Sequence, residues 1–108
     1  MALFRCGESG GGETKHYTYA SGTGSDVTIQ HPTPIQSVVM IEKYGSATTA
    51  SYWFKDDPTH AYQYWVNGSI STITLPNTSD GNTIRDVIGN TVKLNFGSTA
   101  TNIEVLIS

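Results

Sequence analysis

Polar and apolar residues alternate along most of the chain, with the two-residue period of β-strands that have one covered face. The alternation is clear at residues 16–20, 26–30, 70–75, 91–96 and 102–107, and clusters of Gly, Asn, Pro and Ser separate these segments. A long helix is hard to place anywhere in the chain. The pattern therefore predicts an all-β protein of about seven to nine short strands.

One segment, residues 36–44, lacks the alternation because it contains the near-continuous apolar run Val38-Val39-Met40-Ile41. Such a run is typical of a central strand that is covered on both faces. The preceding His31-Pro32-Thr33-Pro34 predicts a corner or a crossover between sheets, since two prolines remove backbone donors and fix φ. We therefore expect the core to centre on this strand.

Turn residues predict which strands are neighbours. Segments 16–20 and 26–30 are expected to form a hairpin or two adjacent strands, and Asn67-Gly68 predicts a type I′ turn between the second aromatic segment and the strand after it. Residues 97–100 are expected to close a last hairpin. For residues 83–88, either one helical turn or a short strand is expected.

Many short strands without helices between them favour an antiparallel β-sandwich, jelly-roll or immunoglobulin-like, with a small barrel as the alternative. Residues 1–14 include the run Gly7-Glu8-Ser9-Gly10-Gly11-Gly12 and are predicted to be a flexible Gly-rich segment. Residues 15–108 are expected to form a single domain, since 108 residues is a common size for one domain.

Composition excludes several classes of partner. Charged residues make up only 14% of the chain and the net charge is -3, so no basic field exists for nucleic acid. Cys6 is the only cysteine, which rules out an intramolecular disulfide. No apolar run reaches membrane-spanning length, and the apolar run within residues 1–6 is too short for a signal peptide. We expect no nucleic-acid or membrane partner, and synthesis in the cytoplasm.

Residues with catalytic or ligating chemistry are few. The strongest group is Asp56-Asp57 with His60, which could bind a metal or act as an acid and base pair, but a solvated turn is the favoured reading because Asp-Asp-Pro-Thr starts turns. His16 and His31 have no second ligand at suitable spacing and are expected to be ordinary strand-end residues.

A further set of oxygen ligands suits Ca²⁺ but lacks the closing Glu of an EF-hand, so a bare surface loop is favoured there. These residues are Asn77, Ser79, Asp80 and Asn82. No Gly-x-Ser-x-Gly motif is present. We therefore expect no catalytic residues, no metal and no cofactor, and hence no enzyme.

Two short segments hold six of the eleven aromatic residues: Tyr52, Trp53, Phe54, Tyr62, Tyr64 and Trp65. Strand alternation places Tyr52 and Phe54 opposite Trp53 in the first segment. In the second it places Tyr62 and Tyr64 opposite Trp65. One set can fill a core while the other faces outward, where Tyr and Trp stack on sugar rings or form protein interfaces. All six are candidate binding residues for a glycan or a protein; the alternative is that both sets are covered. Of the tryptophans, Trp65 is predicted to be core and Trp53 to lie on the contact surface.

Three stretches of the chain carry a resemblance to a known group of proteins: the Met-Ala-Leu-Phe opening with its glycines, Tyr17-Thr18-Tyr19, and the proline-then-apolar segment from Pro34 to Ile41. The chain resembles the small β-sandwich proteins encoded in tail and virion modules of bacteriophages and prophages. That resemblance implies a non-enzymatic tail, fibre or decoration subunit, made in the host cytoplasm and located in the virion. It also implies a homo-oligomer, with other virion proteins or a surface glycan as partners.

Small Ser/Thr-rich sandwiches also occur as carbohydrate-binding modules and as adhesin domains. A glycan-binding module that uses exposed aromatic residues is therefore the alternative function.

Overall fold

The computed structural model describes residues 13–65, 68–78 and 83–108. The expected flexibility of residues 1–12, the turn at Asn67 and the loop oxygens of Ser79, Asp80 and Asn82 therefore lie outside the described residues. Within the described ranges the chain forms strands and no helix, and so no helix that could cross a membrane. The strands are β1 (Lys15–Tyr19), β2 (Asp26–Gln30), β3 (Ser37–Tyr44), β4 (Ala47–Phe54), β5 (His60–Tyr64), β6 (Ile70–Thr74), β7 (Ile84–Ile88), β8 (Thr91–Asn95) and β9 (Asn102–Ile107).

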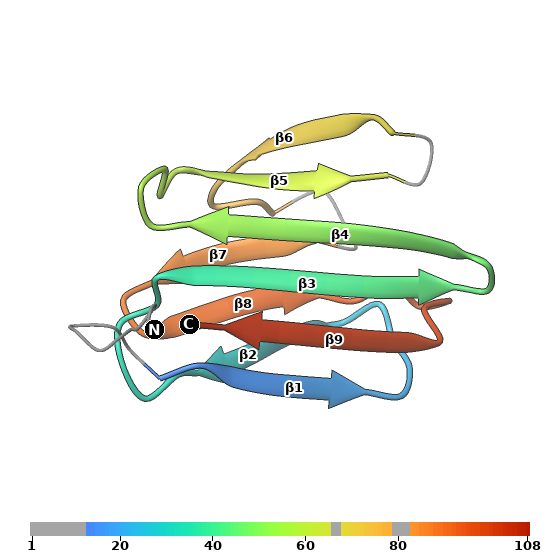
Figure 1. Ribbon diagram of the computed structural model, residues 1–108, viewed down its shortest axis with the longest axis horizontal. Helices are drawn as coiled ribbons and strands as arrows, with labels where there is room; N and C mark the ends of the chain where they lie inside the picture. The colour runs from blue at the N-terminus through green and yellow to red at the C-terminus, as the bar shows by residue number, and fades with distance from the viewer. Residues whose placement is uncertain (1–12, 66–67, 79–82) are drawn as a thin grey trace, which may run out of the picture.

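These strands form two antiparallel sheets that do not close into a barrel (Figure 1). The larger sheet has the order β1-β9-β3-β4-β5-β6, and the smaller has the order β2-β8-β7. Figure 1 shows the smaller sheet behind β3, β9 and β1. The prediction of an all-β antiparallel sandwich is confirmed.

The core lies between the two sheets and follows from the alternation in each strand. β9 contributes Ile103, Val105 and Ile107, and β8 contributes Val92 and Leu94, all fully buried as the pattern predicts. From β3 the residues Val38 and Met40 point inward, and from β7 Ile84 does so. Residues 84–88 are thus a strand, which confirms one of the two alternatives for that segment.

Two of the predicted neighbour relations are wrong. β1 and β2 lie in different sheets, and so do β8 and β9, so neither pair is a hairpin. The connections at 20–25 and 96–101 instead cross between the sheets side by side, and Gly22 N donates to Ala100 O at 3.1 Å. A Cβ at Gly22 would lie 2.0 Å from the Gly97 carbonyl oxygen, so only glycine allows this approach. The crossover expected at residues 31–34 is present between β2 and β3.

Candidate binding surface

The outer side of the larger sheet carries a continuous apolar surface, which we call the outer apolar face. Cross-strand register aligns its apolar side chains in two neighbouring rows, one from β9 to β5 and the next from β3 to β6. One row contains Leu106, Val39, Tyr52 and Tyr62. The next contains Ile41, Ala50, Tyr64 and Ile70, and Phe54 extends the surface on β4.

Exposure of these side chains corrects the expectation that β3 is covered on both faces. Ile41 is 40% exposed and Phe54 is 47% exposed, and Tyr64, Leu106 and Ile70 are exposed as well. β3 is indeed central, between β9 and β4, but only its inner side is covered by the smaller sheet. The apolar run of β3 therefore places Val39 and Ile41 on an open surface.

The aromatic half of this face is a packed cluster of rings, and one of these rings donates a hydrogen bond to the carboxylate of Asp57. Tyr52 lies between Phe54, with ring centroids 5.7 Å apart, and Tyr62, whose ring is stacked on it at 5.8 Å and 26°. The Tyr62 hydroxyl donates to Asp57 Oδ2 at 2.5 Å, and His60 Nδ1 lies 2.9 Å from Asp57 Oδ1. The hydrogen bond from Tyr62 lowers the Asp57 pKa most, and the hydrogen bond from His60 lowers it further. The bond between Tyr62 and Asp57 also raises the Tyr62 pKa. Asp57 thus fixes the orientation of the Tyr62 ring.

The predicted group of Asp56-Asp57 and His60 is therefore only partly brought together. Asp57 and His60 meet in the turn between β4 and β5, and their partner is a tyrosine hydroxyl. Among the residues that the structure describes, no three His, Cys, Asp or Glu side chains are grouped to hold a metal ion. The arrangement orients an aromatic side chain at the outer apolar face.

The two tryptophans are placed opposite to the prediction. Trp53 is 4% exposed and donates from Nε1 to the Pro58 carbonyl at 3.0 Å, whereas Trp65 is 36% exposed and donates to Ser71 Oγ. Trp53 pairs across the ladder with Val38, which is fully buried, so both point between the sheets. Trp65 follows the end of β5. Of the six candidate binding residues, Trp53 is therefore a core residue.

At the other side of the face, a groove of about 260 Å³ lies over β1, β9 and β3. Its lining is Val39, Ile41 and Leu106 with His16 and Glu104. His16 Nε2 lies 2.8 Å from Glu104 Oε1, and both side chains are about half exposed. His16 is thus paired across the β1–β9 ladder, which the sequence reading did not predict. The His16 and Glu104 side chains form a polar border beside the aliphatic residues.

Glu42 is a fully buried acid that sequence reasoning missed. Its Oε2 accepts hydrogen bonds from Gly97 N at 2.8 Å and from the Tyr44 hydroxyl at 3.0 Å. Burial raises the Glu42 pKa, and these two bonds oppose the rise. Thr49 opposes it too, although its hydroxyl misses the full geometry of a hydrogen bond to the carboxylate. Burial, then the Glu42 charge, also raises the Tyr44 pKa. Glu42 shares the inward parity of Val38 and Met40, so alternation alone would have found it.

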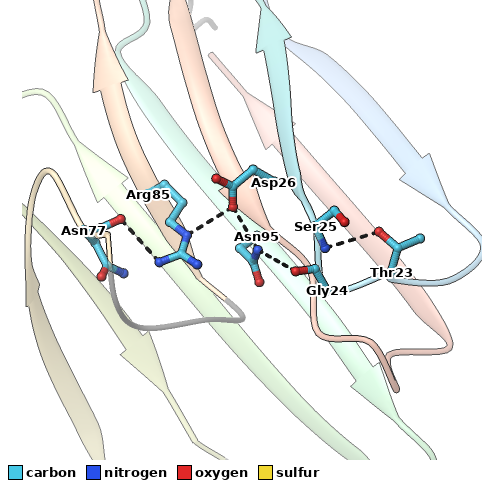
Figure 2. A network of polar contacts seen from close by, with 7 residues as sticks. All are labelled: Thr23, Gly24, Ser25, Asp26, Asn77, Arg85 and Asn95. Carbon is cyan, nitrogen blue, oxygen red and sulfur yellow. Dashed lines mark hydrogen bonds and ion pairs between the residues drawn. The ribbon is translucent and has the colours of Figure 1, made fainter.

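A polar network joins the three strands of the smaller sheet (Figure 2). Asp26 Oδ1 accepts from Arg85 Nε at 3.2 Å and from Asn95 Nδ2 at 2.9 Å, and Arg85 also donates to the Asn77 carbonyl. The bond from Asn95, and then that from Arg85, lower the Asp26 pKa. Asn95 Nδ2 also donates to Gly24 O. Each charged group here has a partner within the protein, so the network ties strands and loops together.

His31 is more than the ordinary strand-end residue that was expected. It is fully buried, and its Nε2 lies 2.7 Å from the Glu13 carbonyl oxygen. Its backbone exchanges hydrogen bonds with Asn90, whose Nδ2 donates to His31 O at 3.0 Å. His31 therefore ties the segment before β1 and the turn before β8 to the sheet crossover.

Comparisons with protein-family models, with curated proteins and with solved structures gave no match for this chain.

Proposed function

We propose that this chain is a non-enzymatic structural subunit that assembles through the outer apolar face into homo-oligomers. The more specific proposal is a virion component of the tail, fibre or decoration kind, on the resemblance of its sequence. The observation that carries the assembly proposal is the surface of exposed and half-buried aliphatic and aromatic side chains that continues across β9, β3, β4, β5 and β6. Contiguous exposed apolar surface of this kind marks interaction sites in soluble proteins.

The position of this surface supports a role in binding another protein. A sandwich needs apolar residues only on the two inner sides of its sheets, and the core here is supplied by those inner sides. Val39, Ile41 and Leu106 add nothing to that core, yet they lie on the central strands of the larger sheet. Their apolar character is explained by contact with a second surface.

A glycan-binding module is the second candidate function. The exposed rings of Phe54 and Tyr64 favour it, because sugar rings stack on aromatic faces. The ring geometry favours a protein partner, since Tyr52 and Tyr62 stack on one another and so cover part of the ring faces that a sugar would use.

Light scattering coupled to size exclusion tests the assembly proposal. The protein should be oligomeric at tens of micromolar, Ile41→Lys should be monomeric, and the matched control Thr28→Lys, on the outer side of the smaller sheet, should remain oligomeric. A wild-type protein that stays monomeric at high micromolar concentration overturns the proposal. Binding to a glycan array that Phe54→Ala abolishes would support the second candidate. Detection of the chain by mass spectrometry in purified phage particles tests the virion assignment.

A further inference from the structure

The outer apolar face has two chemically different halves that meet between β3 and β4. On one side, β9 and β3 present the aliphatic residues Leu106, Val39 and Ile41. On the other side, β4 and β5 present aromatic residues, with the small Ala50 beside Ile41. A surface divided in this way is a candidate for pairing with a second copy of itself, because the aliphatic half of one copy can pack on the aromatic half of the other.

We propose that a second copy of this chain packs on the outer apolar face about a two-fold axis that runs along the strands between β3 and β4. This inference rests on the proposed function and adds the geometry of the contact. The axis lays the aliphatic half of each copy on the aromatic half of the other. Such an isologous contact is closed and gives a dimer.

The register of the larger sheet defines the contacts. Val39 and Tyr52 are paired neighbours on either side of the axis, so Val39 of one copy faces Tyr52 of the other. In the next row Ile41 and Ala50 are paired in the same way, which places the large side chain of one copy against the small one of the other. Large side chains opposite small ones let two sheets interdigitate. The strand directions of two packed sheets differ by about 30°, so residue pairs beside the axis stay aligned better than pairs far from it.

One strand further from the axis, the same symmetry matches polar groups as well. Glu104 lies beside Ile41 in its row, and Tyr64 lies beside Ala50. The two-fold axis therefore sets the Glu104 carboxylate opposite the Tyr64 hydroxyl of the other copy, an acceptor opposite a donor. In the row of Val39, Leu106 is set opposite Tyr62 in the same way.

The area of the face suits a dimer. The five strands of the face, about 4.8 Å apart and each about 17 to 27 Å long, give a flat area of about 400 to 650 Å². Two copies would then remove about 800 to 1,300 Å² from water, which overlaps the lower end of the range of specific protein interfaces. A single small ligand would cover only a fraction of this surface.

A charge exchange across the axis tests the inference. Ile41→Asp and Ala50→Lys each place an unpaired charge in the contact, so each variant alone should be monomeric. When the two are mixed, Asp at 41 of one copy meets Lys at 50 of the other, while the second contact keeps the natural residues. The mixture should form a one-to-one heterodimer, seen by native mass spectrometry, with affinity at least tenfold above that of either variant alone. Far-ultraviolet circular dichroism should show that each variant is folded.

The matched control is Ile70→Lys mixed with Ile41→Asp, because Ile70 lies on the same face but two strands beyond Ala50. This mixture should form no heterodimer, because position 70 does not face position 41 of the other copy. If Ile41→Asp abolishes association but Ala50→Lys does not restore it, the position of the axis is wrong while assembly through this face stands. If Ile70→Lys restores association equally well, the register is also wrong. A wild-type protein that does not associate removes the proposed function itself.

Discussion

The outer side of the larger sheet and the outer side of the smaller sheet are built on the same strand alternation but present opposite chemistry. The smaller sheet shows polar side chains to solvent, among them Thr28, Gln30 and Lys93, with Ile88 as its large exposed apolar residue. The larger sheet shows two rows of aliphatic and aromatic side chains. Because folding needs neither outer side to be apolar, this difference separates a surface suited to water from one suited to a partner.

The strongest test of that comparison lies within β4, where neighbouring aromatic residues point to opposite sides. Trp53→Ala should lower the free energy of unfolding by about 3–5 kcal/mol, since it empties a buried site between the sheets. Phe54→Ala should cost less than about 1 kcal/mol in the monomer, because its ring faces outward. Urea denaturation at low protein concentration measures both. Equal losses would place Phe54 in the core and remove the contrast.

A second test compares exposed isoleucines on the two outer sides. Ile41→Thr should lower stability by about 1 kcal/mol at concentrations where the protein associates, since association removes this side chain from water. Ile88→Thr should change it little at any concentration, because Ile88 is 70% exposed on the smaller sheet. Thermal unfolding at 1 and 100 times a low starting concentration separates the two cases. A concentration-independent effect of Ile41→Thr would assign it to the fold of one chain.

The inner side of the larger sheet, which is otherwise mostly apolar, holds the buried carboxyl group of Glu42. Because burial raises the Glu42 pKa in the folded state, its contribution to stability is present below the unfolded value near 4.5 and is lost as pH rises through the folded pKa. Glu42→Gln keeps an acceptor for Gly97 N and Tyr44, so at pH 8 it should be more stable than the wild type by about 1 kcal/mol. At pH 4 the difference should shrink. Denaturant unfolding at both pH values measures it, and a less stable variant at pH 8 contradicts the assignment.

The smallest effect concerns the support of Tyr62 by Asp57. The Asp57 pKa is lowered by Tyr62 and then by His60, so its stabilising contribution is present above the unfolded value of 3.8 and is lost as pH falls through the folded pKa. At pH 7 the unfolding midpoint of Asp57→Asn should be slightly lower than that of the wild type. At a pH well below 3.8 the two midpoints should be equal. Asp56→Asn, in the same turn, is the control. A difference that persists in acid would show that the carboxylate charge is not responsible.

Alternation predicted most strands and the grouping of side chains, but it could not predict which side faces inward. It separated Trp53 from Tyr52 and Phe54 correctly, while the choice of the inner side depends on the neighbours, here the buried Val38 opposite Trp53. The same limit explains why β3 was expected to be covered on both faces. An apolar run indicates contact on both sides, and a single chain covers only one of them.

Sheet membership was the other part that the sequence could not supply. The connections at 20–25 and 96–101 contain glycine and resemble hairpin turns, but each crosses between the sheets. The close contact of Gly22 with Gly97 appears only when both connections are placed together. For the candidate surface, the sequence identified the aromatic residues and missed the aliphatic half on β3 and β9. That half depends on the pairing of strands distant in sequence, such as Val39 with Leu106.

The place of β9 within the larger sheet bears on how the chain folds during synthesis. β9 is the latest of the described strands in sequence, yet it pairs with both β1 and β3. Until β9 leaves the ribosome, β1 lacks the one ladder partner it has among the described strands, and one edge of β3 remains open to other chains. The nascent protein can form the β3–β4–β5–β6 meander early, because those contacts are local. Insertion of β9 is then the step that joins β1 to the sheet, and chaperone contact before that step is expected at β3.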